Sequence, residues 1–406
     1  MKQIYIIGVG PGNKKSLTYE AGEAIKKAEV IIGSKRLLED YDKSDKKIFF
    51  AVTPGEIINN INKENAYIYA VLMSGDTGFY SGTKKLVEQL HELDNSCNKK
   101  QYDIKILPGI SSVIYLASRI GQSWERAALV SLHGKKQNYI PVVMENEWTY
   151  FLTQGNVSQI CLRLSESGLG DTKVWIGENL SYDNEKVSEG YVREYTEYEA
   201  AGLTVMAVNN EHPQAVCMTG IPDESFIRSE VPMTKREIRA SVVSRLSVAK
   251  DAVVYDIGAG TGSVSIELAM HALYGTVYAV ERTEEGCALI AKNAEKFGLD
   301  NIDIIHGNAA DVIDKLPSPD AVFIGGSGGE LEAVINTVLN KNPKVHILIT
   351  AVTLETLQNA VNIMENSKMS VMDIVQIAVT QIKKRGRYHM MSANNPVFII
   401  EGRGNG

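Results

Sequence analysis

The chain has 406 residues, of which 44% are hydrophobic and 22% are charged, and its formal net charge is −7 at pH 7. That length favours two or three domains, and the composition is typical of globular proteins. The acidic balance argues against a general nucleic-acid coat, and no apolar run approaches the roughly 18 residues of a membrane helix. The first residues enter a strand-like run without a signal peptide, so we expect a cytoplasmic protein with no nucleic-acid or membrane partner.

The four cysteines lie far apart, at positions 97, 161, 217 and 287, and form no Cys-x-x-Cys pair. The histidines form neither a His-x-x-x-His nor a His-Glu-x-x-His pattern. Zinc sites and redox dithiols normally need such close spacings. The sequence therefore predicts no protein metal site, and it favours a reducing compartment.

Short apolar runs alternate with longer helical patterns in the first half of the chain. Strands are predicted at residues 4–7, 30–32, 67–73, 104–107, 128–132, 150–152, 173–176 and 203–208. Helices are predicted between several of them, at 17–28, 81–93 and 112–119. Such alternation implies a largely parallel sheet with helices on its faces.

The second half starts the pattern again. Seven strands are predicted, at residues 252–257, 276–280, 302–305, 321–324, 345–350, 371–379 and 397–400. The helices that separate most of them are predicted at 235–246, 263–271, 284–297, 329–339 and 354–364. A stretch rich in proline, glycine and charge lies between the halves, so we predict a domain at 1–210, a linker at 211–230 and a domain at 231–406.

A glycine-rich loop, Asp-Ile-Gly-Ala-Gly-Thr-Gly at residues 256–262, follows an apolar strand and opens a helix. Glycines let the backbone approach a ligand, and helix amides then point at the polar groups of that ligand. Glu281 ends the next strand, where a carboxylate could accept from both ribose hydroxyls. The Gly-Asn-Ala turn at 307–309 is placed to border an adenine. The third glycine comes one residue too early for the dinucleotide fingerprint, which disfavours a nicotinamide oxidoreductase.

This arrangement resembles the class I S-adenosylmethionine-dependent methyltransferases. The segments 231–239, 323–330 and 395–398 are similar to the C15-methylating, decarboxylating enzymes of cobalamin biosynthesis, which act on a precorrin macrocycle. The resemblance implies a Rossmann-like domain with a seven-stranded sheet. The cofactor-binding residues that it implies are Thr234, Asp256, Gly258, Ala259, Gly260, Thr261, Gly262, Glu281, Asn308 and Ala309. The turn that includes Gly326, Ser327 and Gly328 would face the substrate, because ligands bind at the carboxyl ends of such strands.

A different glycine turn, Gly-Val-Gly-Pro-Gly at residues 8–12, follows the first strand. It is not a Walker A loop, since no Gly-Lys-Ser or Gly-Lys-Thr follows, and Pro11 removes an amide donor. Alone, such a loop is often an ordinary strand–helix turn. Three further turns, at 74–81, 108–112 and 131–134, follow other predicted strands.

Together these turns resemble the tetrapyrrole methylases (class III methyltransferases), in particular the branch that methylates C5 of precorrins. One departure is Thr77, where many relatives have proline after Gly-Asp. The resemblance implies two α/β subdomains around one cofactor site. The cofactor-lining residues that it implies are Pro11, Gly75, Asp76, Ser111 and Ser112. Asp76 could instead form an Asx turn, and the two serines could cap a helix.

The two halves jointly resemble the family of fused precorrin C5,15-methyltransferases (decarboxylating). The resemblance implies one S-adenosyl-L-methionine per methyltransferase site and methylation of C5 and C15 of a precorrin-6/7-level macrocycle. It also implies decarboxylation of the C12 acetate and a homo-oligomer. Cobalt-free and cobalt-bearing substrates remain alternatives, and no catalytic residue is identified.

A corrin precursor carries many carboxylates, so local positive charge is needed. The candidates near the second glycine loop are Lys235, Arg236 and Arg239. Arg385 and Arg387 belong to a cationic run at 383–387, and Arg119 and Arg126 are the candidates in the first half. His133 could face the macrocycle. The alternative for each residue is a solvated or structural role.

A competing interpretation joins an RNA or protein methyltransferase in the second half to a non-catalytic tetrapyrrole-binding module in the first. No Asn-Pro-Pro-Tyr sequence follows the fourth predicted strand of the second half, and no basic and aromatic surface pattern is present. The sequence therefore favours two methyltransferases of one pathway.

Overall fold

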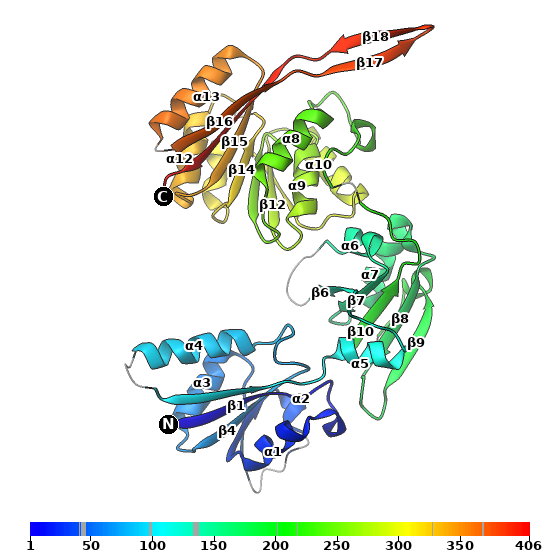
Figure 1. The fold of residues 1–406 in the computed structure, drawn as a ribbon, viewed down its shortest axis with the longest axis vertical. Helices are drawn as coiled ribbons and strands as arrows, with labels where there is room; N and C mark the ends of the chain where they lie inside the picture. Colours follow the sequence, from blue (N-terminus) through cyan, green and yellow to red (C-terminus); the bar gives the residue numbers. More distant parts are fainter. Residues whose placement is uncertain are drawn as a thin grey trace. The chain divides into compact units, whose positions relative to one another are not determined.

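The computed structural model describes residues 1–39, 41, 46–96, 100–132, 138–200, 202–216, 218–326, 328–367 and 369–406. The chain forms two compact units (Figure 1). Unit 1 comprises residues 1–133 and 146–213, and unit 2 comprises residues 134–145 and 214–406. The division at 213–214 falls inside the segment 211–230 for which a linker is predicted. The assignment of 134–145 to unit 2 has no counterpart in the sequence patterns.

Helix α6 (Ile140–Glu145) belongs to unit 2, and residues at and just before its start contact other parts of that unit. Asn138 is fully buried: its side-chain amide donates to the carbonyl oxygen of Ala269 at 3.1 Å, and its Oδ1 accepts from the amide of Asp300 at 2.8 Å. Ile140 packs so close to Gly298 that a Cβ there would lie 2.4 Å from its Cδ1. These contacts satisfy a buried polar group and leave no room for a side chain at position 298.

The first sheet of unit 1 is parallel and has the strand order β3-β2-β4-β1-β5. Its strands are β1 (Lys2–Gly8), β2 (Val30–Gly33), β3 (Lys47–Phe50), β4 (Ile68–Met73) and β5 (Tyr102–Leu107). Helices α1 (Tyr19–Lys27) and α2 (Lys35–Leu38) pack on one face, and α3 (Pro54–Lys63) and α4 (Thr83–Ser96) pack on the other. The sequence patterns missed β3, an edge strand that is only partly buried.

The second sheet of unit 1 has the order β6-β7-β10-β8-β9. Its strands are β6 (Ala128–Ser131), β7 (Trp148–Leu152), β8 (Lys173–Glu178), β9 (Lys186–Tyr191) and β10 (Thr204–Asn209). The β6–β7 pair is parallel and the other three pairs are antiparallel, so the prediction of a largely parallel sheet is wrong here. A short connection makes β8 and β9 a hairpin, and β10 enters between β7 and β8 in the opposite direction. Helix α5 (Ser112–Arg119) covers one face, and α7 (Val157–Leu164) connects β7 to β8.

Unit 2 contains a seven-stranded sheet of order β13-β12-β11-β14-β15-β19-β16. The strands are β11 (Val253–Ile257), β12 (Thr276–Glu281), β13 (Ile302–His306), β14 (Ala321–Ile324), β15 (His346–Ala351), β16 (Met369–Ile377) and β19 (Val397–Gly404). All seven coincide with predicted strands. The sheet is parallel except at β19, which pairs antiparallel with β15 and β16. The strand order reverses beside β11, between β12 and β14, where open α/β sheets bind ligands.

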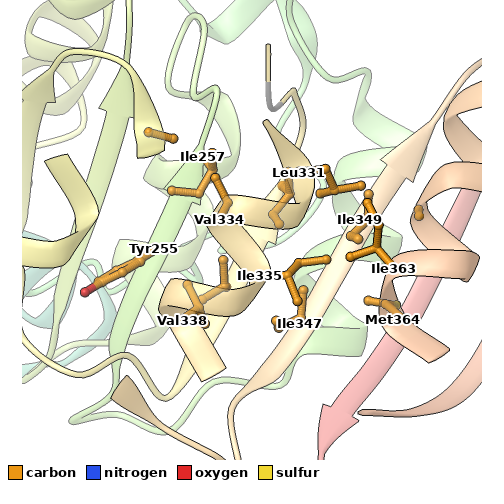
Figure 2. Packing of buried hydrophobic residues seen from close by; sticks show 14 of the residues in the cluster. Tyr255, Ile257, Leu331, Val334, Ile335, Val338, Ile347, Ile349, Ile363 and Met364 are labelled. Atoms are coloured by element: carbon orange, nitrogen blue, oxygen red, sulfur yellow. The ribbon is translucent and has the colours of Figure 1, made fainter. Parts of the chain in front are cut away.

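Helices cover both faces of this sheet. One set is α8 (Arg236–Leu246), α9 (Ser263–His271) and α10 (Glu284–Lys296), and the other is α11 (Ala309–Val312), α12 (Leu331–Lys341) and α13 (Leu354–Asn366). Figure 2 shows Tyr255, Ile257, Ile347 and Ile349 of the strands packed against α12 and α13. Burial of each such side chain stabilises the fold by about 1.5–3 kcal/mol. This core holds the carboxyl ends of β11 and β15 in fixed positions.

A hairpin of β17 (Thr380–Arg385) and β18 (Tyr388–Ala393) extends from this sheet between β16 and β19 (red in Figure 1). The sequence patterns missed it because its apolar and cationic residues do not alternate as in a half-buried strand. Most of its side chains are exposed. Among the helices of the described ranges, none combines the length and hydropathy that crossing a membrane would require.

Candidate functional sites

Three glycine turns meet at the carboxyl ends of β1, β4 and β5 in unit 1. Gly10 and Gly75 exchange two backbone hydrogen bonds, of 3.1 and 2.8 Å. A Cβ on Gly109 would lie 2.3 Å from the carbonyl oxygen of Gly75 and 2.5 Å from that of Gly8. The turns therefore touch through backbone atoms alone, which only glycine permits.

The side chains of Asp76 and Ser111 stabilise these turns by accepting hydrogen bonds from backbone amides. The Asp76 carboxylate accepts from the amide of Gly78 at 2.8 Å and from the amide of Gly109 at 3.0 Å. The Ser111 hydroxyl accepts from the amide of Ile114 at 3.2 Å and so caps α5. Of the alternatives that the sequence left open, the structure has the Asx turn at Asp76 and the helix cap at Ser111. These structural roles do not exclude a cofactor contact, which stays a prediction.

A cavity of about 400 Å³, here called cavity A, opens beside the turns. Its lining comes from both sheets of unit 1 and consists of Pro11, Ser74, Gly75, Ser112, Leu152, Gln154, Gly155, Leu180, Gly202, Leu203, Thr204 and Val205. The structure thus brings together three predicted residues, Pro11, Gly75 and Ser112. The sequence analysis missed the wall from the second sheet, because the residues after β7 and before β10 carry no recognisable motif.

The loop 179–185 joins the two sheets of unit 1 at the first glycine turn. The amide of Asn13 donates to the Ser181 hydroxyl at 3.0 Å. The ring of Tyr182 lies where a side chain on Gly12 would stand, since a Cβ there would be 2.2 Å from it. Arg36 donates to the Tyr182 hydroxyl and, at 2.9 Å, to that of Ser74. These bonds fix the separation of the two walls of cavity A.

Replacing Gly109 by alanine is expected to destabilise unit 1 by about 2 kcal/mol or more, because the added methyl meets backbone oxygens that cannot rotate away. Gly22 of α1 is the control: a Cβ there meets no atom within 4 Å, so Gly22→Ala should stabilise by up to about 1 kcal/mol. Hydrogen exchange of the β1, β4 and β5 amides measures both changes. Equal protection in the two variants would contradict the described packing.

The glycine loop of unit 2 is confined between two other backbone segments. Gly258 and Gly260 have φ values of 74° and 58°. A Cβ on Gly258 would lie 2.4 Å from the carbonyl oxygen of Gly326, and one on Gly260 would lie 2.6 Å from that of Pro232. Side chains are therefore excluded twice, by the backbone conformation and by the neighbouring oxygens. The surface of the loop at these positions therefore consists of backbone peptide groups.

Glu281, at the end of β12, anchors this loop. One carboxylate oxygen accepts from the amide of Gly260 at 2.9 Å. The other accepts from the amide and the hydroxyl of Thr283 at 3.0 and 2.9 Å. The side chain is 7% exposed. A carboxylate has about four acceptor positions, so Glu281 keeps the capacity for a further donor from a ligand.

Asp256, Thr261 and Gly262 belong to the same loop, and each is directed into the protein interior or packed on a helix. The Asp256 carboxylate is buried and accepts from the Ser265 hydroxyl. Within the described ranges, its other oxygen and the Thr261 hydroxyl have no hydrogen-bond partner. Gly262 packs on Ile290 of α10. None of the three is among the residues that line the cavities described next, and their contact with a cofactor stays a prediction.

Two cavities adjoin the loop. Cavity B has about 300 Å³ and includes four predicted cofactor-binding residues besides Gly258: Gly260, Glu281, Asn308 and Ala309. Cavity C has about 560 Å³ and includes the predicted Thr234 and Ala259. The residues that line both are Pro232, Gly258, Gly325, Gly326 and Gly328. Cavities B and C thus share a wall made mostly of glycine backbone.

Arg239 corrects a prediction, because it does not face either cavity. It is fully buried, with its Nε 2.5 Å from a carboxylate oxygen of Glu267 and its Nη1 3.2 Å from one of Asp223. It also donates to the carbonyl oxygen of Thr234 at 2.6 Å. A buried guanidinium needs such partners. Arg239 therefore positions the segment that lines cavities B and C and cannot bind a substrate.

Three further predicted residues, Arg236, Arg385 and Arg387, are not among the residues that line these cavities. Arg236 is exposed on α8, and Arg385 and Arg387 are exposed on the β17–β18 hairpin. Their contact with substrate stays a prediction. His133 and Ser327 lie outside the described residues. No group of three or more metal-ligating side chains occurs in the described part of the chain.

Sequence reasoning missed several residues of cavities B and C. They include Val231, Pro232, Arg282 and Thr283 of cavity B, and Thr350, Thr356, Asn394 and Asn395 of cavity C; Lys235, a predicted candidate, also lines cavity C. Arg282 and Thr283 directly follow the predicted Glu281, so their position after a strand was a usable signal. The other missed residues come together only because of the order of the strands in the sheet.

Comparison with known proteins finds similar chains. One is named probable cobalt-precorrin-6B C(15)-methyltransferase (decarboxylating), from Pyrobaculum calidifontis; it is 43% identical over 45% of this chain and 94% of its own. Its counterpart from Salmonella typhimurium is 38% identical over 44% and 93%. A solved structure of a precorrin-6y C5,15-methyltransferase from Geobacter metallireducens is 38% identical, covers 46% of this chain and 96% of its own, and has a TM-score of 0.43.

Two family models match separate ranges. Residues 3–196 match the tetrapyrrole (corrin/porphyrin) methylases, and residues 225–402 match the precorrin methyltransferase domain. These matches define a methyltransferase. The extent of the identity to the Pyrobaculum protein makes the family specific: the chain belongs to the S-adenosylmethionine-dependent precorrin methyltransferases of cobalamin biosynthesis.

Proposed function

We propose that the chain is a bifunctional enzyme that methylates both C5 and C15 of a precorrin-6/7-level macrocycle. Unit 1 methylates C5, and unit 2 methylates C15 and removes the C12 acetate carboxylate. The observation that carries the proposal is that each unit has its own cavity at glycine turns on the carboxyl ends of parallel strands. The separate family matches support the same division. A cytoplasmic location remains a prediction from the sequence pattern, and a homo-oligomer remains a prediction from the resemblance.

The residues of cavity B fit S-adenosylmethionine in two respects. Its floor of positive-φ glycines admits a ligand close to the backbone, and Glu281 keeps acceptor capacity for ribose hydroxyls. Asn308 and Ala309 follow β13, beside Glu281 across the sheet, where an adenine would lie. The strand order of unit 2 supports a Rossmann-like class I fold.

The chain's contribution to methyl transfer is to position the reactants and exclude water. When bound, S-adenosylmethionine supplies an activated methyl group, so no nucleophile of the protein is needed. The wall shared by cavities B and C is where a donor in cavity B and an acceptor in cavity C would meet. Loss of carbon dioxide breaks a C–C bond of the substrate, and the electron pair can enter the conjugated macrocycle.

In unit 1, cavity A would hold the cofactor between the two sheets. Pro11, Gly75 and Ser112 offer mainly backbone groups, and Gln154 and Thr204 face them from the second sheet. This mode of binding does not depend on the Asp76 carboxylate, whose two oxygens already hold the turns.

The test uses the full chain with S-adenosylmethionine and either cobalt-free or cobalt-bearing precorrin-6-level substrate. Mass spectrometry should show two added methyl groups and one lost carbon dioxide per macrocycle. Isothermal titration calorimetry should show two cofactor molecules bound per chain. One methyl group and one cofactor would instead support a single methyltransferase with a non-catalytic tetrapyrrole-binding unit.

A further inference from the structure

Arg282 is a cation in the wall of cavity B, and the function proposed above gives this side chain no role. It directly follows Glu281 and lines cavity B. Its Nη1 lies 3.7 Å from the position that a Cβ on Gly328 would take. Because Gly328 lines both cavities B and C, the guanidinium stands beside the wall that they share.

The charge of Arg282 is not neutralised by a neighbour. Glu281, the nearest acid in sequence, directs its carboxylate to Gly260 and Thr283 instead. No ion pair of the described ranges includes Arg282. Two other cations of this region differ: Arg239 is buried between acids and lines neither cavity, and Lys235, which lines cavity C, has Asp223 at 3.8 Å.

A guanidinium is always charged, and its planar fork matches a carboxylate with two parallel hydrogen bonds. We propose that Arg282 binds a carboxylate of the tetrapyrrole acceptor and so determines the substrate specificity of unit 2. This inference rests on the proposed function of unit 2. It names a carboxylate that the product retains, because a guanidinium stabilises a carboxylate and would oppose the loss of carbon dioxide from it.

The competing occupant is the methyl donor, which carries a carboxylate of its own. Its sulfonium is positive, so a guanidinium beside the transferred methyl group is unfavourable to the donor. Arg282 lines cavity B, and its Nη1 lies beside Gly328, which also lines cavity C, so the side chain is near the boundary of the two cavities. The acceptor is therefore the favoured partner, and the two occupants are separated by measuring KM for each substrate.

The experiment compares Arg282→Gln with the unaltered full chain in C15 methylation, with products counted by mass. The expected result is a rise of roughly 10- to 100-fold in KM for the tetrapyrrole, with KM for S-adenosylmethionine changed less than about twofold. Arg282→Lys should lie between, since lysine keeps the charge but not the fork. Arg228→Gln removes the same charge from an exposed position of unit 2 outside both linings and should change neither KM.

Two results would overturn the inference. A rise in KM for S-adenosylmethionine alone would assign Arg282 to the donor carboxylate, and no change in either KM would leave it a solvated cation. Absence of C15 methylation by the unaltered chain would overturn the proposed function itself, and the inference with it. Circular dichroism of Arg282→Gln should match the unaltered chain, because an exposed side chain carries little of the fold.

Discussion

Replacing Glu281 by alanine is expected to abolish C15 methylation while C5 methylation persists. The carboxylate holds the amide of Gly260 and both donors of Thr283, and it lines cavity B. Its removal leaves the partly buried amide of Gly260 without this acceptor and frees the glycine loop that would hold the cofactor. We expect a loss of at least about 100-fold in the C15 rate, measured by the masses of the methylated products.

The control for this variant is Glu285→Ala. Glu285 is an exposed acid in the first turn of α10, four residues beyond Glu281, so the same charge is removed without touching the loop. Both methylation rates should then stay near those of the unaltered chain. Loss of both methylations in Glu281→Ala would contradict two independent sites, and unchanged C15 methylation would contradict the role of Glu281.

The turns of the candidate sites could be predicted from the sequence because each follows a continuous apolar strand. A run such as 253–257 is buried on both faces, and a glycine directly after such a run usually forms a tight turn. The same pattern located Gly75, Gly258 and Glu281. Parallel strands then bring these turns to one edge of a sheet, which makes the residues of different strands neighbours.

Pairings between distant residues could not be predicted in this way. The helical period places Arg239 on the same face as the buried Val242 and Val243, yet nothing local shows that its partner is Glu267 of α9, 28 positions further on. Likewise, Gln154 and Gly202 reach cavity A only because β10 enters the second sheet antiparallel between β7 and β8. Local patterns contain neither fact, since both arise from which elements pack together.

Unit 2 is expected to lose stability as the pH rises from about 4 to 7, and Asp256→Asn should remove this loss. Burial raises the pKa of Asp256 from 3.8 to about 7; the Ser265 hydrogen bonds lower it and the charge of Glu281 raises it. The folded state therefore binds this proton more tightly than the unfolded chain. The stabilisation is complete below the unfolded pKa and is lost as the pH passes the folded one.

The size of the effect is a few kcal/mol, since one pKa unit corresponds to about 1.4 kcal/mol. Urea unfolding of unit 2 at pH 5.5 and pH 8 should show a clear fall in the unaltered chain and a much smaller one in Asp256→Asn. Asp314→Asn, which removes an exposed carboxylate from the same unit, should keep the fall of the unaltered chain. If Asp256→Asn kept it as well, the proton would reside on another group. The buried carboxylate costs stability at neutral pH, but its hydrogen bond with Ser265 connects the start of the glycine loop to α9. The Asp256→Asn variant should therefore be more stable than the unaltered chain and should methylate C15 more slowly.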